Sequence, residues 1–568
     1  MSSNEITGAR YLAESLRHLG VTHVFFMDAV LRRSLVEMEQ VGITRVLAHS
    51  EKAAAYMADA YARVTGRVGV CMAQSVGAAN LAAGLQDAWL HRTPVLAITG
   101  RKPSHARDRN AYQEIDHAPL YEAVTKMHAD VEVIDDLPRY LEQAFREATE
   151  GTPRPVHLDL NGLGGQEIEN ATLPGSPMPD VAYGAHPVRR LRPDPAEVEA
   201  AAARLAKAQK PILVAGTGAV QAGAHAAVRA LAESLSLPIA TSLGGRGIVP
   251  TTHALHIGVV GTYSAPITNQ LVHEADLVVY VGCHTGDQVT NNWTVPACGS
   301  AIIQIDVDGR EVGRNYSGVS GVVGDPGIAL DEMAAALGGP KGHGAVDWKD
   351  WAGTAVGRFD TWRESMAEFR TSSATPMRVE RLCHEISEVL PEDAILVADT
   401  GYSGIWTGTV LELKHSGQTY LRAAGSLGWS LPAALGAKAG APDRPVVCFT
   451  GDGGLYYHVP ELETARRRGL PVVVVVNNNS GFGQGVDNVR AIYADTPGNP
   501  DEMNRFSDTN FADVARAFGV EGMRVEQSDE IRPALERALA LNAPVLVDVV
   551  TDVEPRAPAA WTPKVTSS

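Results

Sequence analysis

The feature that most constrains the fold is a regular alternation of short apolar runs with alanine-rich segments along the whole chain. The apolar runs include VGVCMAQ, PVLAITG, PVHLDL, PILVAG, DLVVYVG, AIIQIDVD, AILVADT, PVVCFTG, LPVVVVVNN and PVLVDVV. Such runs are typical of strands that are buried on both faces of a parallel sheet, and the segments between them are typical of the covering helices. We therefore expect an α/β protein with mostly parallel sheets.

Two segments rich in glycine, proline and charge interrupt this alternation, at about 162–195 and 337–350. Composition of this kind is typical of linkers. The segments divide the 568 residues into three predicted domains, at 1–165, 195–337 and 375–552. Each has enough strands for its own sheet, covered by helices on both faces. The remaining residues, 553–568, are expected to form an extended tail or a flap.

Charge and composition indicate which kinds of molecule the protein can bind. The formal net charge of −17 argues against nucleic acid and anionic membranes, although a local basic pocket for a phosphorylated ligand stays possible. The first residues lack the pattern of a secretory signal, and no run of apolar residues is long enough to span a membrane. The five cysteines are scattered without CxxC spacing, which indicates neither disulfides nor zinc. We expect a cytoplasmic protein that binds small molecules and copies of itself.

The strongest local signal is an apolar strand that runs into Gly451-Asp452-Gly453-Gly454 and then into a helix. Glycines allow backbone N–H groups to approach phosphate oxygens, and a helix N-terminus favours negative charge. The next strand ends at Asn479, 27 positions after Asp452, and is followed by Gly481-Phe482-Gly483. A carboxylate, an amide, a loop carbonyl and two diphosphate oxygens form a suitable oxygen shell for Mg²⁺.

This arrangement resembles the thiamine-diphosphate enzymes, whose signature is GDG followed further along the chain by NN. The resemblance implies that Asp452 and Asn479 bind the metal through their side chains and that Gly481 binds it through its carbonyl. It also implies that the glycines and Phe482 around them contact the cofactor. Thiamine diphosphate acts as an electron sink next to a carbonyl.

A second resemblance lies in the N-terminal region. The run Ser50-Glu51-Lys52-Ala53-Ala54, followed by MADAYAR, resembles the HE..A..MAdGYAR stretch of acetolactate-synthase-like members. In this family a glutamate at that place hydrogen-bonds to the pyrimidine ring and activates the cofactor, and here the position is Glu51. The family's usual histidine is Ser50 and its usual glycine is Ala60. Neither change removes the carboxylate.

Further stretches support the same family. QSVGAAN at 74–80 resembles its sGPGatN loop, and AYQE at 111–114 resembles its aFQE, which makes Gln113 a candidate for lining the reaction chamber. DTGYS at 399–403 resembles DvGqH, so Gly401, Tyr402 and Ser403 become predicted diphosphate contacts. AAGSLGWSLPAALGAK resembles glGtMGyGlPaAiGAk, which places Ser426 at the cofactor and Leu427 where an apolar side chain holds the cofactor bent.

Two regions leave alternatives open. VFFMDA at 24–29 replaces the family's vFGvPG, so Asp28 is a candidate for a second acid–base group in the substrate chamber, or else an ordinary loop residue. The middle region resembles the family's central domain, which carries flavin in acetolactate synthase and a nucleotide in acyl-CoA relatives. Gly216, Gly218 and Asp306 are candidates for holding FAD or ADP there.

The function that we expect is a thiamine-diphosphate-dependent lyase or carboligase acting on a small 2-oxo acid or hydroxyketone. A 2-hydroxyacyl-CoA lyase or acyl-CoA decarboxylase is the alternative, for which Arg246, Arg310 and Arg314 are the available phosphate ligands. A hydrolase of cyclic diketones and a catalytically silent regulatory subunit are further alternatives. Because family members bring the glutamate and the aspartate together across a subunit interface, we expect a homodimer at least, with a tetramer as the commoner outcome.

Overall fold

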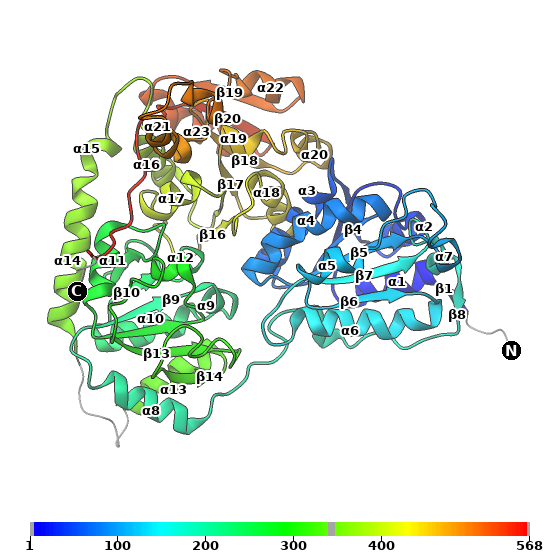
Figure 1. Cartoon of the computed structure of the whole chain (residues 1–568), viewed down its shortest axis with the longest axis horizontal. Helices are drawn as coiled ribbons and strands as arrows, with labels where there is room; N and C mark the ends of the chain where they lie inside the picture. The colour runs from blue at the N-terminus through cyan, green and yellow to red at the C-terminus, as the bar shows by residue number, and fades with distance from the viewer. Residues whose placement is uncertain (1–4, 339–346, 565–568) are drawn as a thin grey trace.

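Within residues 5–338 and 347–564, which this computed structural model describes, three six-stranded sheets organise the chain. Every strand pair in these sheets is parallel, and helices cover them (Figure 1). The predicted fold class is confirmed. The first four residues, residues 339–346 of the second predicted linker and the last four residues of the predicted tail lie outside the described residues.

The N-terminal block is built on a sheet with strand order β3-β2-β4-β5-β7-β6. Its strands are β2 His23–Phe26, β3 Thr44–Leu47, β4 Gly69–Ala73, β5 Val95–Arg101, β6 His128–Val131 and β7 Val156–Asn161. Its helices are α1 Gly8–His18, α2 Arg32–Gln40, α3 Glu51–Thr65, α4 Ser75–His91, α5 Ala118–Glu122, α6 Leu137–Thr149 and α7 Gln166–Asn170. A short antiparallel pair, β1 Ile6–Thr7 with β8 Thr172–Leu173, joins the start of this block to its end.

The central block has strand order β11-β10-β9-β12-β13-β14 and its own hydrophobic core. Its strands are β9 Pro211–Ala215, β10 Ile239–Thr241, β11 His256–Val259, β12 Leu277–Val281, β13 Ala301–Asp306 and β14 Ser320–Val323. Its helices are α8 Pro195–Leu205, α9 Thr217–Gln221, α10 His225–Leu235, α11 Pro266–Glu274, α12 Asp287–Thr290 and α13 Pro326–Gly338; α14 Lys349–Ser365 and α15 Ala367–Arg370 then lead to the C-terminal block.

The C-terminal block has strand order β16-β15-β17-β18-β20-β19. Its strands are β15 Ile395–Ala398, β16 Thr419–Arg422, β17 Val446–Gly451, β18 Val472–Asn478, β19 Glu521–Val525 and β20 Val545–Val550. Its helices are α16 Val379–Val389, α17 Tyr402–Thr409, α18 Ser430–Gly440, α19 Asp452–Leu455, α20 Glu461–Arg468, α21 Val486–Ile492, α22 Phe511–Ala517 and α23 Ile531–Ala540.

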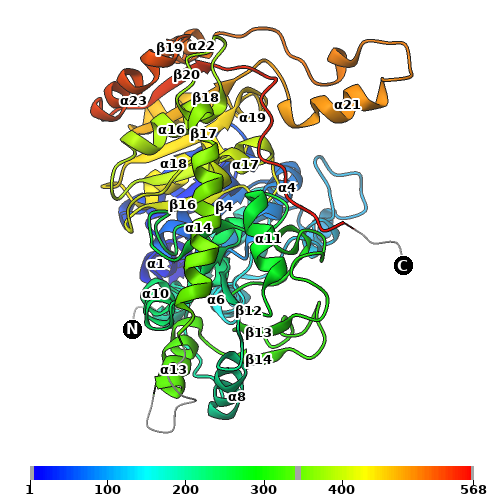
Figure 2. The same cartoon turned by 90° about the vertical axis from the view of Figure 1, so that its left-hand side faces the viewer.

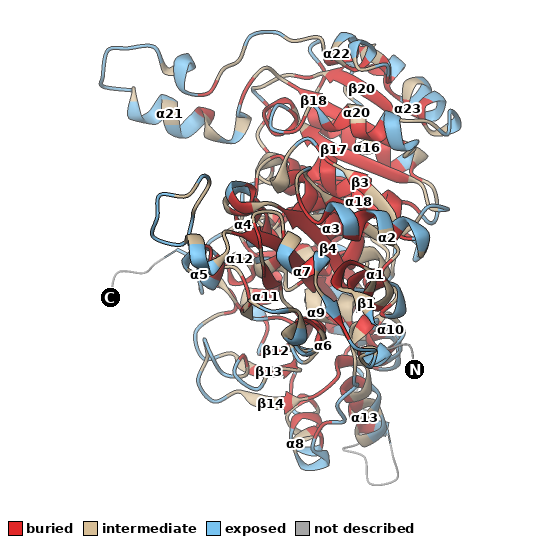
Figure 3. Ribbon diagram, turned by 90° about the vertical axis from the view of Figure 1, so that its right-hand side faces the viewer, coloured by how far each residue is buried: buried red, intermediate tan, exposed pale blue. Residues whose placement is uncertain are grey.

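The N-terminal and C-terminal blocks share one hydrophobic core, in which the alanine-rich helices α3 and α18 pack together. Gly436 of α18 passes so close to α3 that an added Cβ would lie 2.0 Å from the carbonyl oxygen of Met57. Small residues at both surfaces therefore set the separation of the two helices. Figure 3 shows α3, α4 and α18 among the buried elements, whereas α21 carries exposed residues.

The C-terminal tail has no regular secondary structure over residues 553–564 and runs down to the central block (Figure 2). Two ion pairs join the tail to α21, Glu554 with Arg490 and Arg556 with Asp487. Further along, the carbonyl of Trp561 accepts hydrogen bonds from central-block side chains. The tail thus connects α21 with the central block.

Two smaller sequence-based expectations can be compared with the structure. Among the described helices, none is both long and apolar enough to cross a membrane. All five cysteines are unpaired, and four of them are buried as expected. Cys298 is exposed, because it lies in the loop between α12 and β13 rather than in a strand or helix.

Candidate functional site

The candidate site lies at the carboxyl edge of the C-terminal sheet, where ligands bind in open α/β folds. The neighbouring strands β15, β17 and β18 end there, and Gly451 pairs with Asn477 in the parallel register. Residues 399–403, 451–454 and 477–483, which are far apart in the sequence, therefore follow these strand ends side by side.

Asp452 is the first residue of α19, and its carboxylate is buried. One carboxylate oxygen accepts the N–H of Gly453 at 2.8 Å, and the other accepts the N–H of Gly481 at 2.9 Å. Burial raises the pKa of this carboxyl to about 6, against these hydrogen bonds. The Asp452 carboxylate thus joins the GDG motif directly to the asparagine loop. Its negative charge is buried, and two N–H donors do not fully stabilise it.

Asn479 supplies a second oxygen. Its side-chain Oδ1 is buried and has no hydrogen-bond partner among the described residues, and its Nδ2 lies near Gly483. A buried amide oxygen left unpaired is costly unless a ligand completes it. A carboxylate, an amide oxygen and a nearby loop carbonyl are the groups that Mg²⁺ prefers. Across residues 5–338 and 347–564, no three His, Cys, Asp or Glu side chains gather where they could hold a metal ion.

The other predicted cofactor residues surround this pair. Gly401 precedes α17, whose first turn carries Tyr402 and Ser403. Gly451 faces the Ser403 hydroxyl, since an added Cβ would lie 3.7 Å from it, and Gly483 lies against the Tyr402 ring. A Cβ on Gly453 would lie 2.4 Å from the ring of Phe482, and Gly454 lies beside Asp399. The structure brings these predicted residues together around the helix N-termini of α17 and α19.

Leu427 lies half-buried in the turn between β16 and α18. Asp399, at the end of β15, anchors this turn: its buried carboxylate accepts the N–H groups of Gly428 and Ser430 and the Ser430 hydroxyl. Gly428 has φ of +83°, which a glycine adopts without strain. Ser426, the residue before Leu427, is buried.

Glu51 begins α3, capped by the hydroxyl of Ser50, which accepts the N–H of Ala53 at 3.1 Å. The Glu51 carboxylate faces α4: Asn80 donates to it at 3.2 Å, and an added Cβ on Gly77 would lie 2.6 Å from it. These neighbours come from the QSVGAAN stretch, which forms the first turns of α4 rather than a loop. Within one chain, Glu51 thus belongs to a cluster of α3 with α4, whereas Asp452 belongs to the edge of the C-terminal sheet.

Gln113 and Asp28 have different surroundings. Gln113 has φ of +60°, its carbonyl accepts the Ser75 hydroxyl at 2.5 Å, and its Oε1 is buried without a partner among the described residues. Asp28 is exposed and pairs with Arg32 at 3.0 Å, and this hydrogen bond lowers the pKa of Asp28. Gln113 therefore has a buried amide oxygen without a partner among the described residues, whereas Asp28 is ionised in an ion pair.

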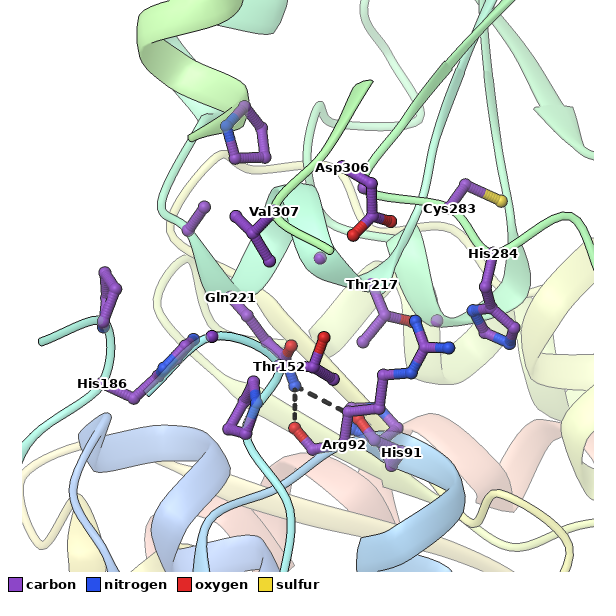
Figure 4. A pocket seen from close by; sticks show the side chains of 18 of the residues that line it. His91, Arg92, Thr152, His186, Thr217, Gln221, Cys283, His284, Asp306 and Val307 are labelled. Carbon is purple, nitrogen blue, oxygen red and sulfur yellow. Dashed lines mark hydrogen bonds between the residues drawn. The ribbon is translucent and has the colours of Figure 1, made fainter. Parts of the chain in front are cut away.

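A separate cavity of about 380 Å³ opens between the three blocks (Figure 4). Of the predicted residues, Gly218 and Asp306 line it; Gly216 packs against the Gly282 carbonyl beside it. Burial raises the pKa of Asp306 to about 6. Arg422 also lines the cavity, donates to Gln288 at 2.6 Å, and has a buried Nε with no partner among the described residues.

The three arginines considered for a CoA phosphate lie elsewhere. Arg246 is buried, and it donates to the carbonyl of Thr407 in the last turn of α17 and to that of Leu411 just beyond this helix. Arg310 pairs with Asp308 and Arg314 pairs with Glu311. None of the three lines the cavity.

Two functional-site carboxylates were not identified from the sequence. Asp399 stands in the DTGYS stretch and follows an apolar strand, as Asp452 does, which could have marked it. Asp87 stands alone as a charge in the apolar stretch LAAGLQDAWL, and a lone charge on a buried helix indicates a buried partner. Asp87 is paired with Arg63 of α3 and with backbone N–H groups of the C-terminal block.

Three family models match the chain in succession. They are the thiamine pyrophosphate enzyme N-terminal TPP binding domain at residues 6–120, the central domain at 198–333 and the C-terminal TPP binding domain at 399–549. Thiamine pyrophosphate is another name for thiamine diphosphate.

Similar proteins cover nearly the whole chain. A "Probable acetolactate synthase large subunit" of Methanocaldococcus jannaschii is 30% identical over 96% of this chain and 92% of its own. An "Acetolactate synthase large subunit" of Parasynechococcus marenigrum is 32% identical over 96% and 87%, respectively. An "Acetolactate synthase" of Arthrospira platensis is 31% identical over 96% and 94%.

Proposed function

This chain belongs to the thiamine pyrophosphate enzyme family, and we propose that it is an acetolactate synthase-like carboligase acting on a small free 2-oxo acid or hydroxyketone. The observation that carries the proposal is the joined site of Asp452 and Asn479 at the sheet edge, in a chain similar to acetolactate synthases over almost its full length. When bound, thiamine diphosphate supplies a nucleophilic carbon and an electron sink for breaking or making a bond next to a carbonyl.

The residues of the chain then have separate tasks. Asp452, Asn479 and the carbonyl of Gly481 hold Mg²⁺, which compensates the diphosphate charge. The unpaired oxygen of Asn479 and the buried carboxylate of Asp452 support this assignment. Glu51 would hold a proton for a ring nitrogen of the bound pyrimidine, and Leu427 would support the cofactor from below with its apolar side chain. The remaining contacts of the cofactor are Gly401, Tyr402, Ser403, Ser426, Gly451, Gly453, Gly454, Phe482 and Gly483.

The donor pocket is formed by the loop at 26–29 and by Gln113, whose unpaired Oε1 supports a polar contact with the substrate. For Asp28, an acid–base role remains part of the proposal. Its ion pair with Arg32 keeps it ionised, so it would act as the base rather than the acid. No CoA requirement is included, because Arg246, Arg310 and Arg314 are each occupied by partners within the chain.

The test compares substrates directly. Purified enzyme with thiamine diphosphate and Mg²⁺ is assayed with pyruvate, longer 2-oxo acids and 2-hydroxyacyl-CoA thioesters at equal concentrations, with products identified by mass spectrometry. Carboligation or decarboxylation of the free acids supports the proposal. Cleavage of the thioesters alone contradicts it and favours a 2-hydroxyacyl-CoA lyase.

The active unit is a homo-oligomer, at least a dimer and in full a tetramer. Separate surroundings of Glu51 and Asp452 within one chain support this, as do the exposed rings of Tyr457 and Phe482 near the site. The shared site is tested by unfolding the two inactive variants Glu51→Gln and Asp452→Ala, mixing them in equal amounts and refolding them together. Shared sites would restore about a quarter of the activity by random pairing; sites within one chain would restore none.

The central cavity holds FAD or ADP. Its walls support this: Asp306 and Arg422 line the cavity, the Asp306 carboxylate would accept hydrogen bonds from ribose hydroxyls, and the unpaired Arg422 Nε would donate to a phosphate. Releasing bound ligand by heating the purified protein, followed by absorbance and mass spectrometry, identifies the nucleotide. Protein that binds neither ligand, even when each is added, contradicts this part.

Two further expectations belong to the same proposal. The domain boundaries are 1–165, 195–337 and 375–552. They are supported by the strands of the three six-stranded sheets, because all strands of one sheet fall within one of these ranges. A cytoplasmic location is supported by the five unpaired cysteines. Limited proteolysis and cell fractionation test these two points.

A further inference from the structure

Asp87 lies near the end of α4 in the N-terminal block, but its carboxylate contacts the C-terminal block. It is fully buried and accepts three successive backbone N–H groups of the turn that follows β16. The distances are 2.9 and 3.0 Å from Ala424, 3.2 Å from Gly425 and 3.1 Å from Ser426. The next residue is Leu427. A single carboxylate thus fixes the backbone that leads into the side chain proposed to support the cofactor.

A second carboxylate and an arginine complete this contact. Arg63 of α3 donates to Asp87 at 3.0 Å, to both carboxylate oxygens of Asp59 at 2.8 and 2.6 Å, and to the carbonyl of Arg422 at 2.7 Å. Its guanidinium lies over the ring of Trp429, at 4.5 Å from the centroid, and the Trp429 indole N–H donates to Asp59 at 3.0 Å. The turn is therefore held at both ends, before and after Leu427.

These buried charges are paired with one another, and the turn supplies their remaining hydrogen bonds. Two carboxylates and one guanidinium lie out of water, and such groups are stable only where each is paired and hydrogen-bonded. The turn supplies those bonds through its N–H groups, one carbonyl and the Trp429 indole. The opposite anchor, Asp399, belongs to the same block as the turn, whereas Asp87 of α4 and Arg63 of α3 tie the turn to the N-terminal block.

We propose that Asp87, together with Arg63, is a positioning residue that fixes the turn carrying Leu427 against the N-terminal block of the same chain, and so holds Leu427 where it supports the cofactor in its reactive form. This inference rests on the proposed function, because it assumes that thiamine diphosphate binds at Leu427. Neither residue contacts the cofactor in this scheme. A displacement of the turn would leave the metal ligands in place but would change the geometry at the reacting carbon, to which rate is sensitive.

The first test needs no cofactor. Backbone amide exchange followed by mass spectrometry is compared for unliganded wild type and Asp87→Asn. An asparagine directs N–H donors where the carboxylate accepted, so the amides of 424–426 should exchange faster in the variant. Unchanged protection of these amides overturns the proposal. Glu169→Gln is the matched control, because Glu169 is also a buried carboxylate that accepts a backbone N–H, from Ser34. It should leave 424–426 protected.

The second test uses thiamine diphosphate and Mg²⁺ without substrate. Calorimetry gives their affinity, and the loss of the cofactor's C2 proton to heavy water, followed by NMR, reports activation. We expect Asp87→Asn to retain affinity within about threefold and to slow C2–H exchange by about tenfold or more at saturation. Equal exchange rates in folded variant and wild type overturn the positioning role.

Arg63→Lys provides a second variant if Asp87→Asn does not fold. It keeps the charge but loses the fork that bonds Asp59, Asp87 and the Arg422 carbonyl together. The same faster amide exchange and slower C2–H exchange are expected, and their absence contradicts the proposal. If wild type itself does not bind thiamine diphosphate, the proposed function fails instead. The two failures are therefore distinguished by the wild-type calorimetry.

Discussion

Replacing Asp306 with asparagine removes a buried charge from the central cavity while keeping the shape of the side chain. Asp306 is 5% exposed, and its Oδ1 accepts the N–H of Asp308 at 2.9 Å. Asparagine accepts the same N–H, so the substitution isolates the effect of the charge. Burial raises the pKa of Asp306 from 3.8 to about 6 in the folded chain.

The sign of the effect follows from this shift. A carboxyl with a raised pKa binds its proton more tightly when folded, so this contribution to stability is complete below pH 3.8 and is lost as pH rises through about 6. Relative to the protonated form, the ionised group costs about 1.6 kcal/mol at pH 5 and about 3 kcal/mol at pH 8. Asparagine has no such cost. The stability of Asp306→Asn relative to wild type should therefore increase by about 1.4 kcal/mol between these pH values.

Urea unfolding of the unliganded proteins at pH 5 and pH 8 measures this difference. Tryptophan fluorescence follows unfolding, because the indoles of Trp348 and Trp351 are buried in the central block, with those of Trp406 and Trp429 in the C-terminal block. Asp308→Asn is the matched control: its hydrogen bond with Arg310 lowers the pKa of Asp308 to about 2, so its contribution is constant above pH 5. The reasoning is refuted if Asp306→Asn differs from wild type by the same amount at both pH values.

Other predictions address the cofactor site and the packing of helices. Glu51→Gln should retain binding of thiamine diphosphate and lose most turnover; near-normal turnover at saturating cofactor would show that Glu51 does not activate it. Asp452→Ala and Asn479→Ala should weaken cofactor binding and make it strongly dependent on added Mg²⁺, and calorimetry giving wild-type affinity for both would exclude the metal site. Gly436→Ala should lower stability by about 1–3 kcal/mol, because its Cβ would meet the Met57 carbonyl. An unchanged urea midpoint would contradict that packing argument.

Sequence reasoning succeeded where the signal is local. The apolar runs became parallel strands because a strand buried on both faces needs apolar residues at every position. The loop around Asp452 and the loop around Asn479 lie together because neighbouring parallel strands end at one edge, so the spacing of the motifs was sufficient.

The parts that the sequence did not reveal depend on contacts between distant positions. Asp87 and the turn at 424–426 are more than 330 positions apart, and no pattern in either segment indicates that the two are in contact. Arg246 was a candidate phosphate ligand because a guanidinium can bind a phosphate through two N–H groups. In the structure these groups donate instead to the carbonyls of Thr407, in the last turn of α17, and Leu411, just beyond it. Such roles follow from the packing of the blocks rather than from any periodicity.

The core shared by the N-terminal and C-terminal blocks has a consequence for synthesis on the ribosome. When the first block emerges, the face of α3 that packs against α18 in the folded protein is uncovered. The reason is that α18 begins only at Ser430, after the whole central block. Domains generally fold in order as they are made, and uncovered apolar surface promotes aggregation. The nascent chain must therefore keep this surface in contact with water, or with a chaperone, until most of the protein has been translated. The central block, whose core is its own, can fold meanwhile.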